Sequence, residues 1–210
     1  MIITYQGDNY FKFQSGNTTI LTDPTDQRSF RGADIILNSQ YPAPVGNKIS
    51  NVIKKPSPES RVFWIDHAGE YEIGGVRIQG WQSTSLNSES STKSNLSDIE
   101  RTIYRLDFDD FRIALFGFLE DVPKDEFQEY LTDIDIVIAP ASNGDFMKVS
   151  DMVKFIRQLE PALIILPFTK NFKNLLKEFN KEKCEKEEKI VLRKNDLAES
   201  EMEIRCLKSI

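Results

Sequence analysis

The stretch RVFWIDHAGEYEIGGVRIQG, from Arg61 to Gly80, is the part of the sequence around which the rest can be interpreted. Within it, Arg61 to Ile65 is a short apolar run and Val76 to Gln79 alternates apolar and polar residues, so each run predicts a β-strand. The glycines between the two runs allow the chain to turn sharply. Taken alone, these residues predict two strands joined by a glycine-rich crossing.

Short β-rich runs also precede this stretch. Ile2 to Tyr5, Tyr10 to Phe13 and Thr18 to Leu21 are separated by turn-prone clusters of Gly, Asp, Asn and Ser, and this pattern predicts a β-meander. The compact apolar run from Ala33 to Leu37 predicts a strand buried in a sheet. A short run at Asn51 to Ile53 follows a loop rich in proline.

The pattern changes after Ser83. The segment STSLNSESSTKSNLSD, Ser83 to Asp98, is too polar to bury and is expected to form a mobile loop. The charged run Lys181 to Lys189 is expected to be a solvated helix end and loop. The other elements expected here are a hairpin (Thr102–Asp107 and Phe111–Leu115), a helix from Pro123, a strand (Ile134–Ala139), a helix capped by Ser150 and Asp151, a strand (Ala162–Leu166), a helix around Phe172–Phe179, and two closing strands (Ile190–Leu192 and Met202–Leu207).

Length and composition limit the fold and its partners. A chain of 210 residues with 40% hydrophobic residues can bury one sizeable core, and we expect a single domain over residues 1–210. The order of elements, β-rich at both ends with strands and helices alternating between them, favours an α/β (α+β) architecture of two packed sheets with helices outside. The formal net charge of −6 disfavours a nucleic-acid binder, which needs a basic face.

The cysteines and the hydropathy pattern indicate the cellular compartment in which we expect the protein. Cys184 and Cys206 form neither a disulfide framework nor a CxxC metal motif, and we expect both to be reduced thiols. No window approaches the roughly 18 apolar residues that a membrane span needs, and the N-terminus lacks a secretory signal pattern. We therefore expect a cytoplasmic protein that does not bind membranes.

Asp66 and the run GEYEIGGV, Gly69 to Val76, resemble the internal D…GEYE(V/I)GGV segment of metallo-β-lactamase-fold hydrolases, in the branch that contains ascorbate-6-phosphate lactonase-like proteins. Further segments resemble the family in the same order along the chain. They are ITYQGDNYFKF…TILTDP (Ile3–Pro24), ADIIL (Ala33–Leu37), TIYRLDFDDFRIALFG (Thr102–Gly117), IDIVIAP (Ile134–Pro140), RQLEPALIILP (Arg157–Pro167) and VLRKNDL (Val191–Leu197). The resemblance implies a four-layer αββα sandwich of two mixed β-sheets flanked by helices, with the active site where the connecting loops gather at the sheet edges.

The metal ligands of that family are missing. Its enzymes hold one or two zinc ions through an HxHxDH loop and further His and Asp ligands, whereas this chain contains one histidine. The residues at the positions where the resemblance implies ligands are Gln40, Pro42, Pro44 and Val45 in the loop, Phe118 for the bridging Asp and Phe168 for the last His. We expect no metal, no cofactor and no catalytic residue, and we expect the rings of Phe118 and Phe168 to fill the vacated pocket.

The remaining polar residues have structural explanations. His67 falls at a position that is not a metal ligand in the family, and we interpret it as a structural or surface residue, although it could be a general base beside Asp66. An oxygen-only cluster of Asp8, Asp23, Asp66 and Asp121 could hold Mg²⁺ or Ca²⁺, but turns and a helix cap account for most of these carboxylates. The predicted vestigial site comprises Asp8, Asp23, Gln40, Asp66, His67, Phe118, Asp121 and Phe168.

Three functions remain open. The favoured one is a non-catalytic binding or interaction module, which would bind an unknown protein partner or a second copy of itself. The second is a hydrolase that acts on a small lactone or phosphoester through a non-standard site. The third is an inactive subunit that pairs with an active paralogue.

Overall fold

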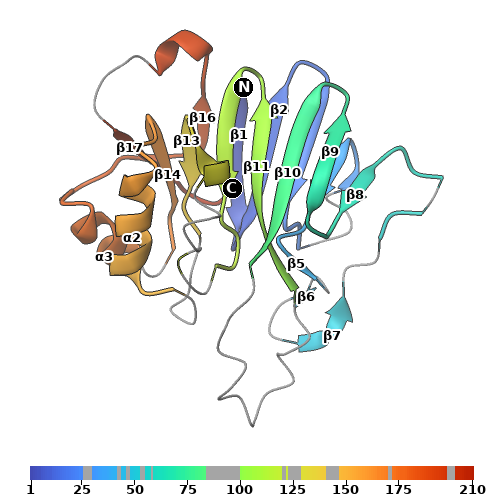
Figure 1. Ribbon diagram of the computed structural model, residues 1–210, viewed down its shortest axis with the longest axis horizontal. Helices are drawn as coiled ribbons and strands as arrows, with labels where there is room; N and C mark the ends of the chain where they lie inside the picture. Colours follow the sequence, from blue (N-terminus) through green and yellow to red (C-terminus); the bar gives the residue numbers. More distant parts are fainter. Residues whose placement is uncertain are drawn as a thin grey trace.

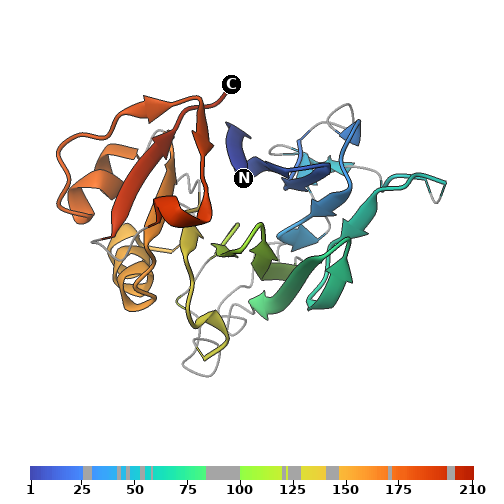
Figure 2. The same cartoon turned by 90° about the horizontal axis from the view of Figure 1, so that it is seen from above.

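The computed structural model describes residues 1–25, 30–41, 44–45, 48–52, 55–57, 59–83, 100–119, 122, 129–140, 147–169, 172–197 and 202–210. In this part of the chain, two mixed β-sheets pack face to face, and helices lie against one of them (Figures 1 and 2). This arrangement confirms the predicted fold class. None of the described helices is long and apolar enough to cross a membrane.

The six-stranded sheet contains the predicted N-terminal meander. Its strand order is β16-β1-β2-β3-β4-β8, in which β1, β2 and β3 are antiparallel and β4 joins both β3 and β8 in parallel. Asp8 makes the first turn of the meander with a positive φ of 50°, a conformation that Asp tolerates better than most residues. The strands are β1 (Ile2–Gly7), β2 (Tyr10–Ser15), β3 (Thr18–Thr22), β4 (Ile35–Leu37), β8 (Phe63–Ile65) and β16 (Lys189–Val191).

The nine-stranded sheet is antiparallel from β9 to β12 and parallel from β12 through β13 and β14 to β17. The predicted hairpin is present as β11 and β12, and β5 pairs with the start of β11. The strands are β5 (Gln40–Tyr41), β9 (Gly69–Ile73), β10 (Val76–Ser83), β11 (Glu100–Phe108), β12 (Phe111–Leu115), β13 (Ile136–Ile138), β14 (Leu163–Pro167), β15 (Lys186–Glu187) and β17 (Glu203–Leu207). A separate pair is formed by β6 (Pro44–Val45) and β7 (Lys48–Val52).

Two helices cover the parallel half of the nine-stranded sheet. They are α2 (Val149–Gln158) and α3 (Phe172–Glu178), beside β14 and β17 in Figure 1. Buried residues of α2, among them Phe155 and Ile156, pack with Val137 and Ile164 on the outer face of the sheet. Among the described residues, no helix covers the outer face of the six-stranded sheet. The short 3₁₀ helices η2 (Glu129–Leu131) and η3 (Lys194–Asp196) complete the described elements.

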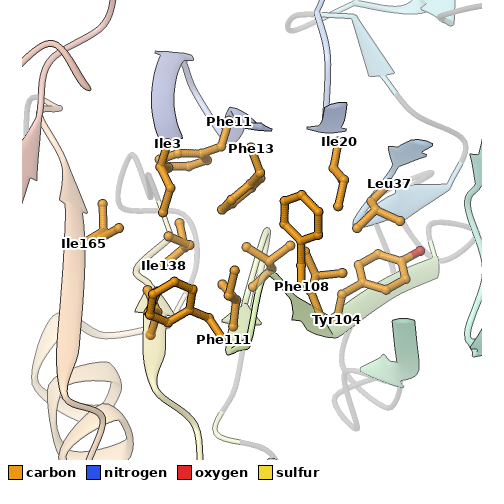
Figure 3. Close-up of a cluster of buried hydrophobic side chains, with 14 of the residues drawn as sticks. Ile3, Phe11, Phe13, Ile20, Leu37, Tyr104, Phe108, Phe111, Ile138 and Ile165 are labelled. Carbon is orange, nitrogen blue, oxygen red and sulfur yellow. The ribbon is translucent and has the colours of Figure 1, made fainter. Parts of the chain in front are cut away.

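The main core lies between the two sheets. Alternate side chains of each strand point into it, as Ile3 and Tyr5 of β1 do, because successive residues of a strand face opposite sides. Figure 3 shows side chains from the six-stranded sheet meeting side chains from the other sheet. Those labelled are Ile3, Phe11, Phe13, Ile20 and Leu37 on one side, and Tyr104, Phe108, Phe111, Ile138 and Ile165 on the other.

The structure corrects several predicted elements. The chain between the two strands of the opening stretch is itself partly a strand, because β9 pairs with β10 through a hairpin at Gly74 and Gly75. Helix α2 begins at Val149, with Lys148 rather than Ser150 at its N-cap. The charged run Lys181 to Lys189 contains β15 and the first residue of β16. The predicted loop after Ser83 and the start of the helix from Pro123 lie outside the described residues.

The expectation of two reduced thiols is wrong for this structure. Cys184 and Cys206 form a disulfide, with their Cα atoms 6.1 Å apart. Sequence spacing suggested no pairing because Cys184 follows α3 whereas Cys206 lies in β17, and only the fold brings these two segments together.

Candidate functional site

A narrow crevice lies where β3, β4, β12 and β13 end, between the two sheets. It is lined by Asn9, Phe11, Thr22, Asp23, Leu37, Ser39, Tyr104, Leu115, Phe116, Gly117, Ile138, Ala139 and Pro140. Its volume is ≈ 20 Å³, which is room for about one water molecule, whereas ligand pockets typically measure about 300 Å³ or more. The sequence resemblance placed the active site in this part of the fold.

Asp23 and Ser39 join two of the strand ends that form the crevice. The backbone N–H of Ser39 donates to Asp23 Oδ1 at 2.7 Å, and the Ser39 hydroxyl donates to Oδ2 at 2.5 Å. Asp23 has a positive φ of 42°, and its own N–H donates to Leu37 O at 2.8 Å. Desolvation raises the pKa of Asp23 to about 7, although both hydrogen bonds from Ser39 lower it in part. Near neutral pH this carboxyl group is therefore partly protonated.

Gly117 brings the end of β12 against the same serine. Its φ is +52°, and a Cβ added here would lie 2.2 Å from Ser39 Oγ and 2.4 Å from Ser39 Cβ. Only glycine therefore fits both the backbone conformation and the space. We call Asp23, Ser39 and Gly117 the Asp23 corner.

The residues expected at the positions of the zinc-binding loop lie in short β-strands, except for the one that falls outside the described residues. Gln40 is buried and lies in β5, opposite Arg101 of β11. The N–H of Thr102 donates to Ser39 O at 2.9 Å, which extends this pairing by one residue. Pro44 and Val45 form β6, and Pro42 lies outside the described residues. The backbone of this loop is therefore held by strand pairing next to the crevice.

The two predicted pocket-filling rings do not line the crevice. Phe118 is partly exposed in the turn after Gly117. Phe168 is 39% exposed, and its ring packs 4.8 Å from the ring of Phe172 at the start of α3, with Lys186 Nζ 3.6 Å from its centroid. Phe11, Tyr104 and Phe116, which come from three different strands or strand ends, occupy the crevice walls instead. The walls of the narrow crevice are therefore formed by residues that the resemblance did not single out.

A second polar cluster surrounds Asp66 at the end of β8. Its side chain is 6% exposed and accepts hydrogen bonds from Lys55 Nζ at 2.9 Å, Trp64 Nε1 at 2.8 Å and His67 Nδ1 at 2.6 Å. Burial by itself raises the pKa of Asp66, but the bonds from Lys55, Trp64 and His67 together lower it below its ordinary value. We call these four residues the Asp66 corner.

Tyr104 lies between the two corners. Its hydroxyl donates to Asn38 O at 3.0 Å, and His67 O is 3.5 Å away. Burial, with a smaller contribution from the charge of Asp23, raises the pKa of Tyr104 above its usual range. The phenol therefore stays protonated and acts as a hydrogen-bond donor that ties the end of β4 to β11.

The other predicted site residues are placed less centrally. Asp8 lies in the turn between β1 and β2, and its neighbour Asn9 lines the crevice. Asp121 lies outside the described residues. Within the described ranges, no group of three or more His, Cys, Asp or Glu side chains is arranged to hold a metal ion. Sequence reasoning missed Ser39, Tyr104 and Gly117, although a glycine after the apolar strand of LFGF could have indicated a close approach.

Comparisons with known proteins agree with this geometry. The sequence model of the family described as "Beta-lactamase superfamily domain" matches residues 2–167. A search of curated proteins finds no match. Among solved structures, the chain is similar to a candidate Zn-dependent hydrolase of the metallo-β-lactamase superfamily from Thermotoga maritima, with a TM-score of 0.68 and 17% identity, covering 100% of this chain and 99% of that one.

Two further structures share the fold. A candidate metal-dependent hydrolase from Parabacteroides distasonis has a TM-score of 0.62 and 20% identity, covering 97% of this chain and 91% of that one. An isothiocyanate hydrolase from Delia radicum gut bacteria has a TM-score of 0.58 and 13% identity, covering 86% and 91% of the two chains. At these identities the likeness establishes the fold and leaves the chemistry to be argued from the residues present.

Proposed function

Because the chain belongs to the beta-lactamase superfamily, we propose that it keeps the fold of metal-dependent hydrolases without their zinc binding and hydrolysis, and acts as a non-catalytic binding or interaction module. The residues of the Asp66 to Val76 segment suggest the lactonase-like branch of the superfamily as its origin. Its partner would be another protein or a second copy of itself. This function accounts for a retained scaffold with an altered site.

The closed crevice is the observation that carries the proposal. Hydrolysis needs space for a substrate and an activated water beside the reacting group, and a volume of ≈ 20 Å³ holds neither a lactone nor a phosphoester. The contact between Gly117 and Ser39 leaves no room for a side chain at position 117. The strand ends that carry Ser39 and Gly117 thus meet in direct contact at this place, which supports the proposal.

The available donors do not fit zinc. Catalytic zinc sites use three protein ligands, mostly histidine with a carboxylate or cysteine, and this chain has one histidine, whose Nδ1 bonds Asp66. Both oxygens of Asp23 already accept hydrogen bonds from Ser39, and Asp66 accepts three. These bonds occupy two of the roughly four acceptor positions of the Asp23 carboxylate and three of those of Asp66, which leaves few positions for a cation. We therefore derive no step through a metal ion.

The metal content of the purified protein tests the proposal. After incubation with excess zinc and removal of weakly bound ions, elemental analysis should find far less than one zinc per chain, and a chelator should leave the melting temperature unchanged. The same protein should not hydrolyse lactone, phosphoester or thioester substrates. One tightly bound zinc per chain, together with a chelator-sensitive hydrolase activity, would overturn the proposal.

A second candidate function rests on the Asp66 corner. Asp66 holds His67 by Nδ1, the arrangement in which a carboxylate orients an imidazole as a general base. If the protein hydrolyses a small ester without a metal, His67→Ala should abolish the activity and Lys55→Met should not. A hydrolase activity that survives His67→Ala would rule out this candidate.

A further inference from the structure

The disulfide between Cys184 and Cys206 attaches a surface segment to the nine-stranded sheet. Cys206 is fully buried in β17 and belongs to the apolar cluster beneath α2 and α3. Cys184 lies between α3 and β15 and is partly buried. The Cα separation of 6.1 Å is within the range that a disulfide spans without backbone movement.

Among the described residues, few side-chain contacts other than the disulfide hold residues 181–186 to the rest of the protein. Helix α3 is followed by Asn180, whose φ of 58° turns the chain away, and the N–H of Lys181 bonds back to Leu176 O at 2.9 Å. From residue 181 to residue 186, every residue except Cys184 is exposed, and every residue except Cys184 is charged. Such a segment buries little apolar area, so its local stability depends strongly on the cross-link.

The bond is also accessible from one side. An open groove of ≈ 430 Å³ lies between the segment and β17, and Cys184, Lys181 and Lys183 line it. The thiolate of a reductant is the species that attacks a disulfide, and the groove that leads to Cys184 is lined by two lysines against one carboxylate, that of Glu203, which favours the approach of an anion. A reductant can therefore reach the sulfur of Cys184 through the groove, whereas Cys206 is shielded.

We propose that Cys184 and Cys206 form a redox modification site, a reversible disulfide that a dithiol reductant opens in the folded protein. One thiolate of the dithiol attacks Cys184 Sγ, a mixed disulfide forms, and Cys206 leaves as a thiolate that takes up a proton. The second thiol of the reductant then attacks the reductant's sulfur atom in the mixed disulfide. The reductant closes to a disulfide, and Cys184 is released as a thiolate that takes up a proton. In total, the dithiol is oxidised to a disulfide, and the protein gains two electrons and two protons.

Reduction would release residues 181–185 from β17 while the sheets stay assembled. β15 keeps its parallel pairing with β17, and Glu187 keeps its ion pair with Arg205. A reversible bond also fits the cytoplasmic location expected from the sequence, since disulfides in that compartment are usually transient or redox-sensing. The inference does not depend on the absence of zinc or on the identity of a partner.

Limited trypsin digestion in native buffer tests the proposal, because Lys181 and Lys183 lie just before Cys184 in the segment that the bond holds. The oxidised protein should be cut slowly after both lysines, and dithiothreitol should accelerate these cuts by about tenfold or more. Lys189 of β16 is the internal control. It pairs with Thr4 of β1, so the rate of cleavage after Lys189 should not change. Cys184→Ser should be cut fast with or without dithiothreitol.

Intact mass and near-ultraviolet circular dichroism complete the test. Mild reduction should leave the dichroism spectrum native, and alkylation of the reduced protein should add one label in native buffer, at Cys184, and a second label, at the buried Cys206, only after denaturation. In a sample that has not been alkylated, removal of the reductant with mild oxidation should restore the slowly cut form. The proposal is overturned if the thiols stay free under mild oxidation, if the bond resists dithiothreitol until the protein is denatured, or if the cuts at Lys181 and Lys183 occur at the same rate in both forms. The zinc measurement has no bearing on any of these outcomes.

Discussion

Both corners hold neighbouring strand ends, but the pKa of the central carboxyl group is raised in one corner and lowered in the other. In the Asp23 corner, a neutral serine donates both hydrogen bonds, and desolvation raises the pKa of Asp23 to about 7. In the Asp66 corner, the donors include the Lys55 ammonium, and the pKa of Asp66 is lowered despite its burial. Desolvation therefore dominates at Asp23, whose donors are neutral, whereas at Asp66 the hydrogen bonds, one of them from a charged ammonium group, outweigh desolvation.

The two corners should therefore respond to different changes. In the Asp23 corner, strand ends meet by direct contact and by hydrogen bonds to neutral donors, so its integrity should depend on shape. The Asp66 corner ties Lys55 and His67 to the end of β8 through charge, so its integrity should depend on ionisation. Each prediction below tests one side of this contrast.

The largest effect is expected for Gly117→Ala. The added Cβ would meet Ser39 Oγ at 2.2 Å in a backbone conformation that already disfavours alanine, so we expect a loss of about 3 kcal/mol or more in the free energy of unfolding. Gly74→Ala is the matched control, because its φ is +57° but its Cβ would meet nothing within 4 Å. We expect that variant to lose about 1 kcal/mol. Equal losses in urea titrations of the two variants would mean that the Ser39 contact is not tight.

The next largest effect is expected for Asp66→Asn. The amide keeps the size of the side chain but removes the charge that pairs with Lys55 and His67, and we expect a loss of about 2 kcal/mol at pH 7. Since the pKa of Asp66 is lowered in the folded state, this stability is present above the ordinary value of 3.8 and is lost as the pH falls below it. The difference between variant and native protein should therefore shrink at low pH in urea titrations. A difference that is independent of pH would contradict an ionic role.

Asp23→Asn should behave in the opposite way. The folded state holds its proton up to about pH 7, so the stability contributed by Asp23 is fully present below the ordinary pKa of 3.8 and declines as the pH rises to about 7. Asparagine resembles the protonated acid, so the variant should match the native protein near pH 4 and exceed its stability by about 1–2 kcal/mol at pH 8. Thermal unfolding across this pH range measures the crossover. A variant that is less stable than the native protein at pH 8 would show that the ionised carboxylate is the favoured form.

The smallest effect is expected for Phe168→Ala. The ring is 39% exposed and contacts Phe172 and Lys186 outside both corners, so its removal should cost about 1 kcal/mol. Phe116, which is 1% exposed and lines the crevice, is the control, and Phe116→Ala should cost about 3–5 kcal/mol. If urea titrations show the same loss in the free energy of unfolding for both variants, the ring of Phe168 contributes to filling the crevice.

The sequence predicted the strands better than the site. Alternating runs such as Ile2 to Tyr5 and buried runs such as Ala162 to Leu166 were identifiable because period and apolar content depend on neighbouring residues alone. The strand Gly69 to Ile73 was missed although GEYEI alternates polar and apolar residues, because the glycines at its two ends were interpreted as a turn-forming crossing. The resemblance singled out Asp23, but Ser39, which bonds it, and Gly117, which lies against Ser39, come from two other strand ends.

The aromatic residues show the same limit. Phe118 and Phe168 were chosen because the resemblance places them where the family has metal ligands, yet such a match gives a position in the chain and not the direction of a side chain. The packing of Phe168 on Phe172 depends on how α3 follows β14, which single-sequence patterns do not specify. The disulfide was missed for a similar reason, since the contact between its two segments is a property of the assembled sheet.

The chain passes from one sheet to the other several times, among them between β8 and β9 and between β15 and β16, where edge strands are joined. A protease nick between β10 and β11 would leave two fragments, and each would carry strands of both sheets. The N-terminal piece would lack the β16 neighbour of β1, and the C-terminal piece would lack the β10 neighbour of β11. Neither could cover its exposed strand alone, so the separated pieces should recombine when mixed, as a split reporter protein does.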